Sequence, residues 1–264
     1  MTRAFEPTQV QQAFSSAADS YDGAAELQRE VARRLLERLD DTSQQPQRVL
    51  DLGAGTGEVT SWLRKRYPRS LLLAADPARG MIEKARSRAG WLRPYRCLQA
   101  RAEGLPLRPA SIDLLFSNLA LQWTNQLDQA LAQAHKTLAA KGMLVLSTFG
   151  PATLWQLRDS WAKVSDAEHV NRFDSLQEVG DCLLRLGFRD PVVDTETITL
   201  TYTEPKQLLR ELKAIGAHNI NPGRPRGLTG RRRLQGMLDA YAEHRDSNGL
   251  WPASYEVIYA SAWR

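Results

Sequence analysis

Cysteine is scarce in this chain, and long apolar runs are missing from it. Only Cys97 and Cys182 occur among 264 residues, and both lie in apolar segments where buried thiols are common. This scarcity argues against a disulfide framework and favours a reducing, cytoplasmic compartment. No segment approaches the roughly 18 apolar residues of a membrane span, and the N-terminal segment has no apolar signal region. We therefore expect a soluble, cytoplasmic protein that makes no use of a membrane.

Neither sign of charge dominates, because 35 Lys and Arg residues stand against 30 Asp and Glu, giving a formal net charge of +5. This mild basic excess favours an acidic partner or substrate and does not require nucleic acid. Hydrophobic residues at 42% and charged residues at 25% exclude a disordered or coiled-coil chain, and the length suits one large domain. Metal chemistry is not expected, since the four histidines share no ligand spacing: His135, His169, His218 and His244.

Short apolar runs recur at regular intervals in the first part of the chain, with amphipathic segments between most of them. Strands that alternate with helices indicate a parallel sheet with right-handed crossovers, so the predicted fold class is α/β. The strands are expected at residues 48–53, 71–76, 94–100, 111–118 and 142–149. Helical periodicity from Thr8 to Asp40, broken by a turn at Asp22-Gly23, predicts two helices before the first strand.

The pattern changes after Gly150. We expect helices at 152–163 and 175–186, an alternating strand at 191–202, a helical insertion at 205–245 and a last strand at 255–263. The two late strands could pair antiparallel. The sheet would then be mostly parallel, with a reversed strand at one edge.

A glycine-rich turn follows the first expected strand, in the segment VLDLGAGTGEVTSWL. Gly53, Gly55 and Gly57 let a ligand approach bare backbone, and the N-terminus of the next helix favours negative groups. The spacing departs from the G-x-G-x-x-G of dinucleotide folds, so a nicotinamide cofactor is the minor interpretation. Asp76 ends the second strand, where a carboxylate can accept hydrogen bonds from ribose hydroxyls. Taken singly, each feature could be an ordinary turn or an ordinary strand-end aspartate.

The combination of D-x-G-x-G-x-G after one strand and an acid after the next resembles the class I S-adenosylmethionine-dependent methyltransferases. Their Rossmann-like fold binds the donor across the carboxyl ends of the strands. By this resemblance, Gly53, Gly55 and Gly57 would line the methionine part of S-adenosylmethionine. Asp51 would help to hold its ammonium group, and Asp76 would hold its ribose.

The adenine end of the donor site departs from the family pattern. The segment QARAEGLPL resembles the family's third motif, but Arg101 stands where the family commonly has an aspartate. Adenine would then rely on the Ala102 backbone and on apolar contacts, although residues 103–106 could equally form a plain turn. Asn118 follows the next strand on the ligand side, and we expect it to contact the donor.

The acceptor is indicated by four segments together: AFSSAADSYDGAAELQ, SNLALQW, HVNRF and LKAIGAHNINPGR. They resemble the malonyl-[acyl-carrier protein] O-methyltransferases of biotin synthesis over nearly the whole chain. SNLALQW is also similar to the trans-aconitate methyltransferases, so a small-acid carboxyl methyltransferase stays open. A donor-binding assembly or regulatory protein without methyl transfer is the rival from another class. A malonyl carboxylate is already ionised at pH 7, so no general base is expected.

The resemblance places Arg172, in HVNRF, among residues that face the acceptor, and a planar guanidinium suits a carboxylate clamp. Lys213 and Arg224 are the next candidates. Tyr21 could close over the donor and touch the acceptor carboxylate, and Trp123 could form a wall of the acceptor pocket. As structural alternatives, the cations could be solvated surface residues, and the aromatic rings could simply pack between helices.

A basic stretch from Arg224 to Arg233 could dock an acidic carrier protein by steering and rim contacts. Nucleic acid is unlikely as a partner, because no aromatic residues interleave with these arginines. We expect a single domain over 1–264. Its parts would be an N-terminal lid at 1–40, a donor-binding core at 41–150, and acceptor-side helical insertions at 151–188 and 205–245.

Overall fold

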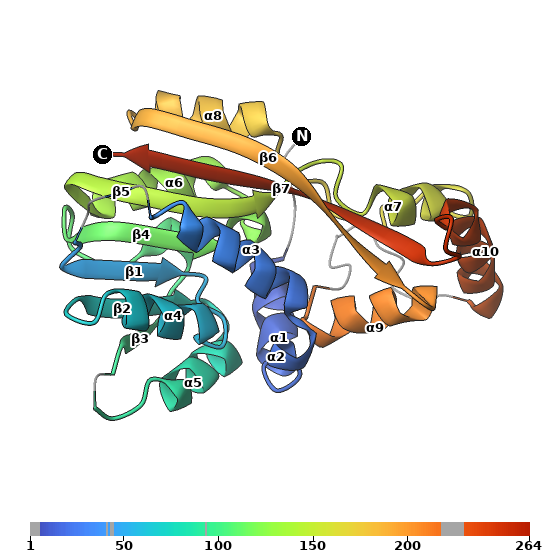
Figure 1. Cartoon of the computed structure of the whole chain (residues 1–264), viewed down its shortest axis with the longest axis horizontal. Helices are drawn as coiled ribbons and strands as arrows, with labels where there is room; N and C mark the ends of the chain where they lie inside the picture. The colour runs from blue at the N-terminus through green and yellow to red at the C-terminus, as the bar shows by residue number, and fades with distance from the viewer. Residues whose placement is uncertain (1–5, 41, 43–44, 93, 218–229) are drawn as a thin grey trace.

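Seven strands form one sheet in the computed structural model, which describes residues 6–40, 42, 45–92, 94–217 and 230–264. The strand order is β3-β2-β1-β4-β5-β7-β6 (Figure 1). The strands are β1 Arg48–Leu52, β2 Leu71–Asp76, β3 Arg96–Gln99, β4 Ile112–Asn118, β5 Leu138–Phe149, β6 Arg189–Tyr202 and β7 Trp251–Trp263. The expected strands are confirmed, and the order reverses between β1 and β4, where open α/β sheets bind ligands.

Strands β1 to β5 pair in parallel, and β7 runs antiparallel to both of its neighbours, β5 and β6. The prediction of a mostly parallel sheet with one reversed strand is confirmed. The reversed strand, β7, lies one position in from the edge, and β6 is outermost. The antiparallel pairing of β6 and β7 is continuous for most of their length, from Val192 opposite Ser261 to Tyr202 opposite Trp251.

The helices of the described chain fall into three groups. Before the sheet come α1 Pro7–Ala17, α2 Tyr21–Ala24 and α3 Glu26–Glu37. Between the parallel strands come α4 Glu58–Arg66, α5 Arg79–Arg88 and α6 Leu127–Thr137, with the short 3-10 turns Ala102–Gly104 and Leu121–Trp123. The last group is α7 Trp155–Ala162, α8 Leu176–Arg185, α9 Pro205–Ala214 and α10 Arg231–Tyr241. Residues 21–24, predicted as a turn, form the helix α2 instead.

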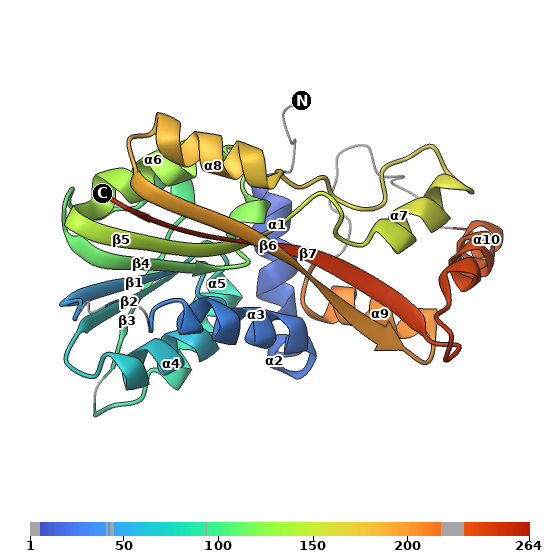
Figure 2. The same cartoon turned by 45° about the horizontal axis from the view of Figure 1, so that its top comes forward.

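The two faces of the sheet bury separate apolar clusters because parallel strands are covered by helices on both sides. On one face α3 and α4 pack through Val31, Leu35 and Leu63 against alternate strand residues such as Phe116. On the other face α6 and α8 cover the intervening residues through Leu131 and Leu183. Figure 2 shows α6 and α8 on one side of the sheet and α3 and α4 on the other. None of the described helices combines the length and apolar character needed to cross a bilayer.

Strands β6 and β7 run well beyond the other strands, and α7, α9 and α10 gather around their far ends (Figures 1 and 2). The apolar cluster follows them, since Tyr202, Leu208, Met237 and Tyr241 belong to the same cluster as the core. Helix α3 is tied to β6 by two ion pairs, Arg34 with Glu196 at 2.7 Å and Arg38 with Asp194 at 2.5 Å, at positions where β7 still pairs with β5. These contacts hold the outermost strand against α3.

Candidate active site

The glycine turn after β1 is crowded at two of its three glycines and open at the third. Gly53, Gly55 and Gly57 all have positive φ, which favours glycine at each position. A Cβ on Gly53 would lie 2.1 Å from Ala120 Cβ, and one on Gly57 would lie 2.4 Å from Tyr95 Oη. A Cβ on Gly55 would meet nothing within 4 Å. Gly53 and Gly57 thus allow close packing, whereas Gly55 presents bare backbone to open space.

Two buried carboxylates support this turn. Asp76 Oδ2 accepts a hydrogen bond from the Gly55 N–H at 3.0 Å, and Oδ1 accepts one from the Ala78 N–H at 2.8 Å. Asp51 Oδ2 accepts a hydrogen bond from Thr60 Oγ1 at 2.5 Å. Burial raises the pKa of Asp76 to about 6 and that of Asp51 to about 7, because desolvation disfavours the charged form. A cationic or hydrogen-bond-donating ligand would restore the charge of both groups.

Helices α1 and α2 lie over the glycine turn. Asp22 accepts a hydrogen bond from Thr56 Oγ1 at 2.6 Å and forms an ion pair with Arg88 of α5. Asp19 forms an ion pair with Lys84 at 2.6 Å. The N-terminal segment is therefore fastened to both sides of the turn after β1 by side-chain contacts.

Two small recesses lie beneath this N-terminal segment. One, of about 40 Å³, brings together four predicted site residues, Asp51, Gly53, Gly55 and Asn118, with Tyr21 at its border. The other, of about 70 Å³, is lined by Gly53, Ala102 and Trp123 together with residues of α1. Neither Gly57 nor Asp76 lines a recess; they hold the turn in place from behind.

The donor expected from the sequence fits the first recess chemically. Gly55 offers open space beside backbone, and Asp51 supplies a carboxylate for an ammonium group. Within the described residues, the buried Oε1 atom of Gln28 has no hydrogen-bond partner, and Gln28 also lines the recess. An ammonium group donates up to three hydrogen bonds, so it could satisfy this oxygen as well.

Charged residues flank Ala102 where the sequence departs from the family motif, and the contact with adenine stays a prediction. Arg101 forms an ion pair with Glu103 at 3.3 Å, and Glu103 accepts a hydrogen bond from Thr124 Oγ1 at 2.5 Å. Ala102 lines the recess beside them. Burial opposes ionisation of Glu103, but its hydrogen bonds with Arg101 and Thr124 outweigh this and hold its pKa below the usual range. No group of three or more His, Cys, Asp or Glu side chains in the described part of the chain could hold a metal ion.

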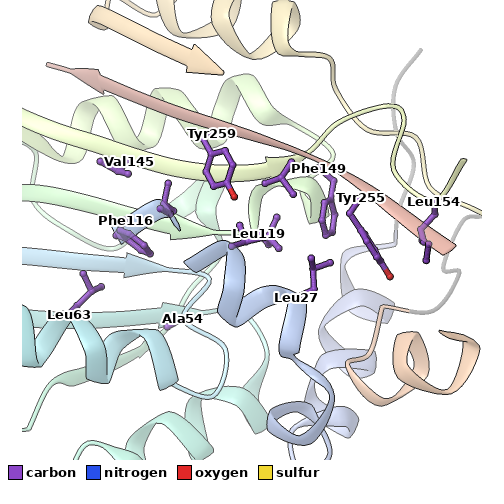
Figure 3. Close-up of a cluster of buried hydrophobic side chains, with 14 of the residues drawn as sticks. Leu27, Ala54, Leu63, Phe116, Leu119, Val145, Phe149, Leu154, Tyr255 and Tyr259 are labelled. Carbon is purple, nitrogen blue, oxygen red and sulfur yellow. The ribbon is translucent and has the colours of Figure 1, made fainter. Parts of the chain in front are cut away.

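A larger cavity of about 310 Å³ lies next to the first recess, and Tyr21 and Gln28 line both. Its walls are mainly apolar and come from α1, α3, α7, α9, β7 and the loops after β4 and β5. Figure 3 shows part of this lining, including Leu27, Leu119, Phe149, Leu154 and Tyr255. The polar groups are few, so a bound acceptor would be enclosed chiefly by carbon atoms.

The predicted acceptor residues do not all reach this cavity. Trp123 lines it, with its ring 5.1 Å from that of Phe14 in an edge-to-face contact. Arg172 does not line it; its side chain is 67% exposed and forms an ion pair with Glu168 at 2.6 Å. Lys213 is also exposed and absent from the lining. Arg224 lies outside the described residues, so its predicted role stays a prediction, as do those of Arg172 and Lys213.

Several polar residues of the cavity were not identified as site residues from the sequence, among them Gln28, Asn171 and Glu211. Asn171 is the neighbour of Arg172 and is only 7% exposed. Glu211 accepts a hydrogen bond from Tyr202 at 3.1 Å, and burial raises its pKa. In the sequence, only its place in the HVNRF segment indicated that Asn171 could be a site residue. Gln28 and Glu211 lie on helices whose periodicity marks them only as polar positions.

Comparison with known proteins places the chain among methyltransferases. The family described as Methyltransferase domain matches residues 50–146. A malonyl-[acyl-carrier protein] O-methyltransferase of Halorhodospira halophila is 48% identical over 255 residues, covering 96% of this chain and 86% of that protein. One from Laribacter hongkongensis is 45% identical over 274 residues, covering 100% and 92%.

Solved structures agree on the fold. The YcgJ protein of Bacillus subtilis has a TM-score of 0.62 and 19% identity, with 88% of this chain and 98% of that chain covered. An identity this low bears on the fold alone. The expected Rossmann-like, class I methyltransferase fold is confirmed.

The buried aspartates lead to a prediction for donor binding. We expect the affinity for S-adenosylhomocysteine to fall as the pH decreases through about 7 and then about 6, because Asp51 and Asp76 lose charge in that order. Asp76→Asn should weaken binding at pH 8 by ~1.5–3 kcal/mol, the value of hydrogen bonds to a charged group. The substitution should also abolish the fall in donor affinity near pH 6, because that fall is assigned to protonation of Asp76. Isothermal titration calorimetry at several pH values measures both effects.

Asp113 offers a matched control for this experiment. It likewise accepts two backbone hydrogen bonds, from Gln47 and Arg48 at 2.9 and 2.8 Å, but at the opposite end of the sheet. Asp113→Asn should leave donor affinity and its pH profile unchanged. An Asp76→Asn variant with wild-type affinity across the pH range would contradict the assignment of Asp76 to the donor site.

Proposed function

The chain belongs to the malonyl-[acyl-carrier protein] O-methyltransferase family, and we propose on this premise that it methylates the free carboxylate of a malonyl thioester carried by acyl carrier protein. It is an S-adenosylmethionine-dependent methyltransferase. The product would be the methyl ester, formed early in biotin synthesis. The observation that carries this proposal is the apolar cavity that lies next to the proposed donor recess and shares Tyr21 and Gln28 with it.

The donor supplies a methyl carbon bonded to a sulfonium, which an acceptor carboxylate oxygen attacks in line while the carbon–sulfur bond breaks and its electron pair stays on sulfur. No proton moves, since the carboxylate is ionised at pH 7. The chain therefore needs no general base. Its task is to hold the two reactants in contact and to exclude water. Helices α1 and α2, fastened over the turn by Asp22, are suited to exclude water from the junction.

Seven residues are proposed to hold the donor: Asp51, Gly53, Gly55, Gly57, Asp76, Ala102 and Asn118. Asp51, Gly53, Gly55 and Asn118 border one recess, and Ala102 borders the other. Asp76 fixes the Gly55 backbone by a hydrogen bond and would keep lone pairs for the ribose hydroxyls. Gln28 joins this set, because its unpartnered oxygen lies in the recess that contains Asp51.

Tyr21 is proposed as the residue that orients the acceptor carboxylate. It borders both the donor recess and the acceptor cavity. Burial raises its pKa well above the usual value, with the charges of Asp76 and Asp22 acting in the same direction. The phenol therefore keeps its proton at neutral pH and can donate a hydrogen bond to a carboxylate without neutralising it.

The carrier protein is proposed to dock beside the outer end of the cavity. Arg231, Arg232 and Arg233 are exposed in the first turn of α10. His169 lines the cavity, and burial together with the charge of Arg233 lowers its pKa. Arg172 is exposed a few residues away along the chain. We propose that Arg231, Arg232, Arg233 and Arg172 form a basic rim that suits an acidic carrier. The docking stretch predicted from the sequence begins at Arg224, and residues 224–229 lie outside the described part of the chain.

The predicted parts of the domain are retained as a proposal. Residues 1–40 would act as the lid, 41–150 as the donor-binding core, and 151–188 and 205–245 as acceptor-side insertions. Support comes from α1 and α2 lying over the glycine turn and from α7 and α9 contributing to the acceptor cavity. We also infer a cytoplasmic location, supported by the two cysteines, neither of which is in a disulfide.

Mass spectrometry tests the proposed reaction directly. Incubation of malonyl-acyl carrier protein with the enzyme and S-adenosylmethionine should add one methyl group to the carrier-bound malonyl. Methylation of trans-aconitate with no reaction on malonyl-carrier protein would favour the small-acid enzyme. Donor binding without product from either acceptor would favour an assembly or regulatory protein.

A Tyr21→Phe substitution should lower kcat/KM for malonyl-carrier protein by roughly 10- to 100-fold, because it removes a hydrogen bond to a charged group worth ~1.5–3 kcal/mol. Steady-state kinetics measures kcat/KM, and calorimetry measures the affinity for the donor, which should stay near the wild-type value. Tyr241→Phe is the matched control, since Tyr241 is also buried and donates to the Pro252 carbonyl at 2.8 Å, away from the donor. Equal kcat/KM values for the two variants would argue against Tyr21 as the orienting group.

Neutralising Arg231, Arg232 and Arg233 to Gln should slow turnover of malonyl-carrier protein and leave malonyl-coenzyme A turnover less affected, because exposed charges act mainly on encounter with the carrier. Added salt should have the same selective effect on wild type. A control variant removes three exposed cations from elsewhere on the surface: Lys65, Arg69 and Arg108.

Arg172→Ala separates the two roles considered for this residue. If Arg172 only contacts the carrier at the rim, the variant should lose turnover on malonyl-carrier protein alone. If Arg172 clamps the malonyl carboxylate, as predicted from the sequence, turnover of malonyl-coenzyme A should fall by a similar factor. For the variant with Arg231, Arg232 and Arg233 replaced by Gln, an equal loss of turnover on malonyl-carrier protein and on malonyl-coenzyme A would contradict docking of the carrier at the basic rim.

A further inference from the structure

Asn171 has a buried oxygen that lacks a hydrogen-bond partner. Its side chain is 7% exposed and lines the acceptor cavity. Within the described residues, nothing donates to Asn171 Oδ1. Buried acceptors are nearly always paired, so an unpaired one in a cavity wall calls for a donor, which a bound ligand can supply.

The malonyl group cannot supply the missing donor. Its carboxylate, methylene and thioester groups carry no N–H or O–H at neutral pH, so they offer acceptors only. The donor must come from the part of the substrate beyond the thioester sulfur. In acyl carrier protein and in coenzyme A that part is a pantetheine arm, whose first amide N–H follows the sulfur after a short ethylene segment.

The two ends of the cavity fix the direction of the substrate. Tyr21 and Gln28 mark the donor end, because they also line the donor recess. His169 belongs to the other end, because it stacks on Trp161 of α7 and α7 packs against α10, away from α2 (Figure 1). Asn171 follows His169 closely in the chain. A substrate with its carboxylate at Tyr21 would therefore extend its thioester arm toward Asn171.

The surroundings of Asn171 suit such an arm. The His169 ring stacks on Trp161 with centroids 3.8 Å apart, and the Phe173 ring lies 5.6 Å from that of Phe149. All four rings line the same cavity, so they can cover methylene groups on either side of one polar contact. The cavity volume of about 310 Å³ also leaves room beyond a malonyl group.

We propose that Asn171 binds the pantetheine arm of the acceptor, with Oδ1 accepting a hydrogen bond from the amide N–H nearest the thioester. This inference rests on the proposed function, because it takes a malonyl thioester as the substrate. In this proposal Asn171 binds the pantetheine arm, whereas Tyr21 binds the malonyl carboxylate at the opposite end of the cavity.

Three acceptors test the proposal: malonyl-pantetheine, malonyl-N-acetylcysteamine, which keeps only the first amide, and the ethyl thioester of malonate, which has none. Wild type should prefer the two amide-bearing acceptors over the ethyl thioester by about tenfold in kcat/KM, the effect of one hydrogen bond. Asn171→Leu should reduce this preference to near unity. The preference is a ratio within one protein, so partial loss of folded enzyme cancels from it.

Asn171→Asp keeps an acceptor oxygen and removes the amide N–H groups, so it should retain the preference even if all rates fall. Gln122→Leu is the matched control: this cavity amide donates to the Leu119 carbonyl at 2.7 Å and should not affect the preference. An unchanged preference in Asn171→Leu, or its loss in Asn171→Asp, would overturn the proposal. Failure of wild type to methylate any of the three would instead count against the proposed function.

Discussion

The bond between the Asp76 carboxylate and the Gly55 N–H is the constraint on which the donor site depends. It joins the end of β2 to the middle of the turn after β1, and the second oxygen of Asp76 holds Ala78 at the start of α5. Asp76 and Asp51 are buried and have raised pKa values, so burying their charged forms at neutral pH costs free energy in the ligand-free protein. The proposed donor, a cation with hydroxyl groups, would offset this cost, so the carboxylates that shape the turn would also favour its ligand.

The acceptor cavity depends on the extension of β6 and β7. These strands pair with each other far beyond β5, and their outer ends provide the surface on which α7, α9 and α10 pack. Helix α9 is also joined to the N-terminal segment, since Ser20 Oγ donates to the Ala214 carbonyl at 2.7 Å. The N-terminal segment and α9 thus contact each other, and both contribute to the walls of the acceptor cavity.

Residues tied to backbone geometry were predictable, and those defined by neighbours distant in sequence were not. Gly53 and Gly57 could be identified because they follow an apolar run directly, and Asp76 because it closes the next apolar run. Arg172 was predicted from the family resemblance and from the fit of a guanidinium to a carboxylate, whereas the side chain in the cavity wall is its neighbour Asn171. Segment 163–175 contains little regular structure, and without a periodicity no pattern says which side chain points inward.

Local periodicity, turn chemistry and motif spacing were sufficient to predict the α/β class, the order of strands and helices along the chain, the glycine turn with its two acids and the methyltransferase family. The position of β7 between β5 and β6, the helix at residues 21–24 and the cavity shared by Gln28, Asn171 and Glu211 became evident only in the folded protein. Those outcomes depend on contacts between segments far apart in the chain, whose burial and charge are fixed only when the elements pack together.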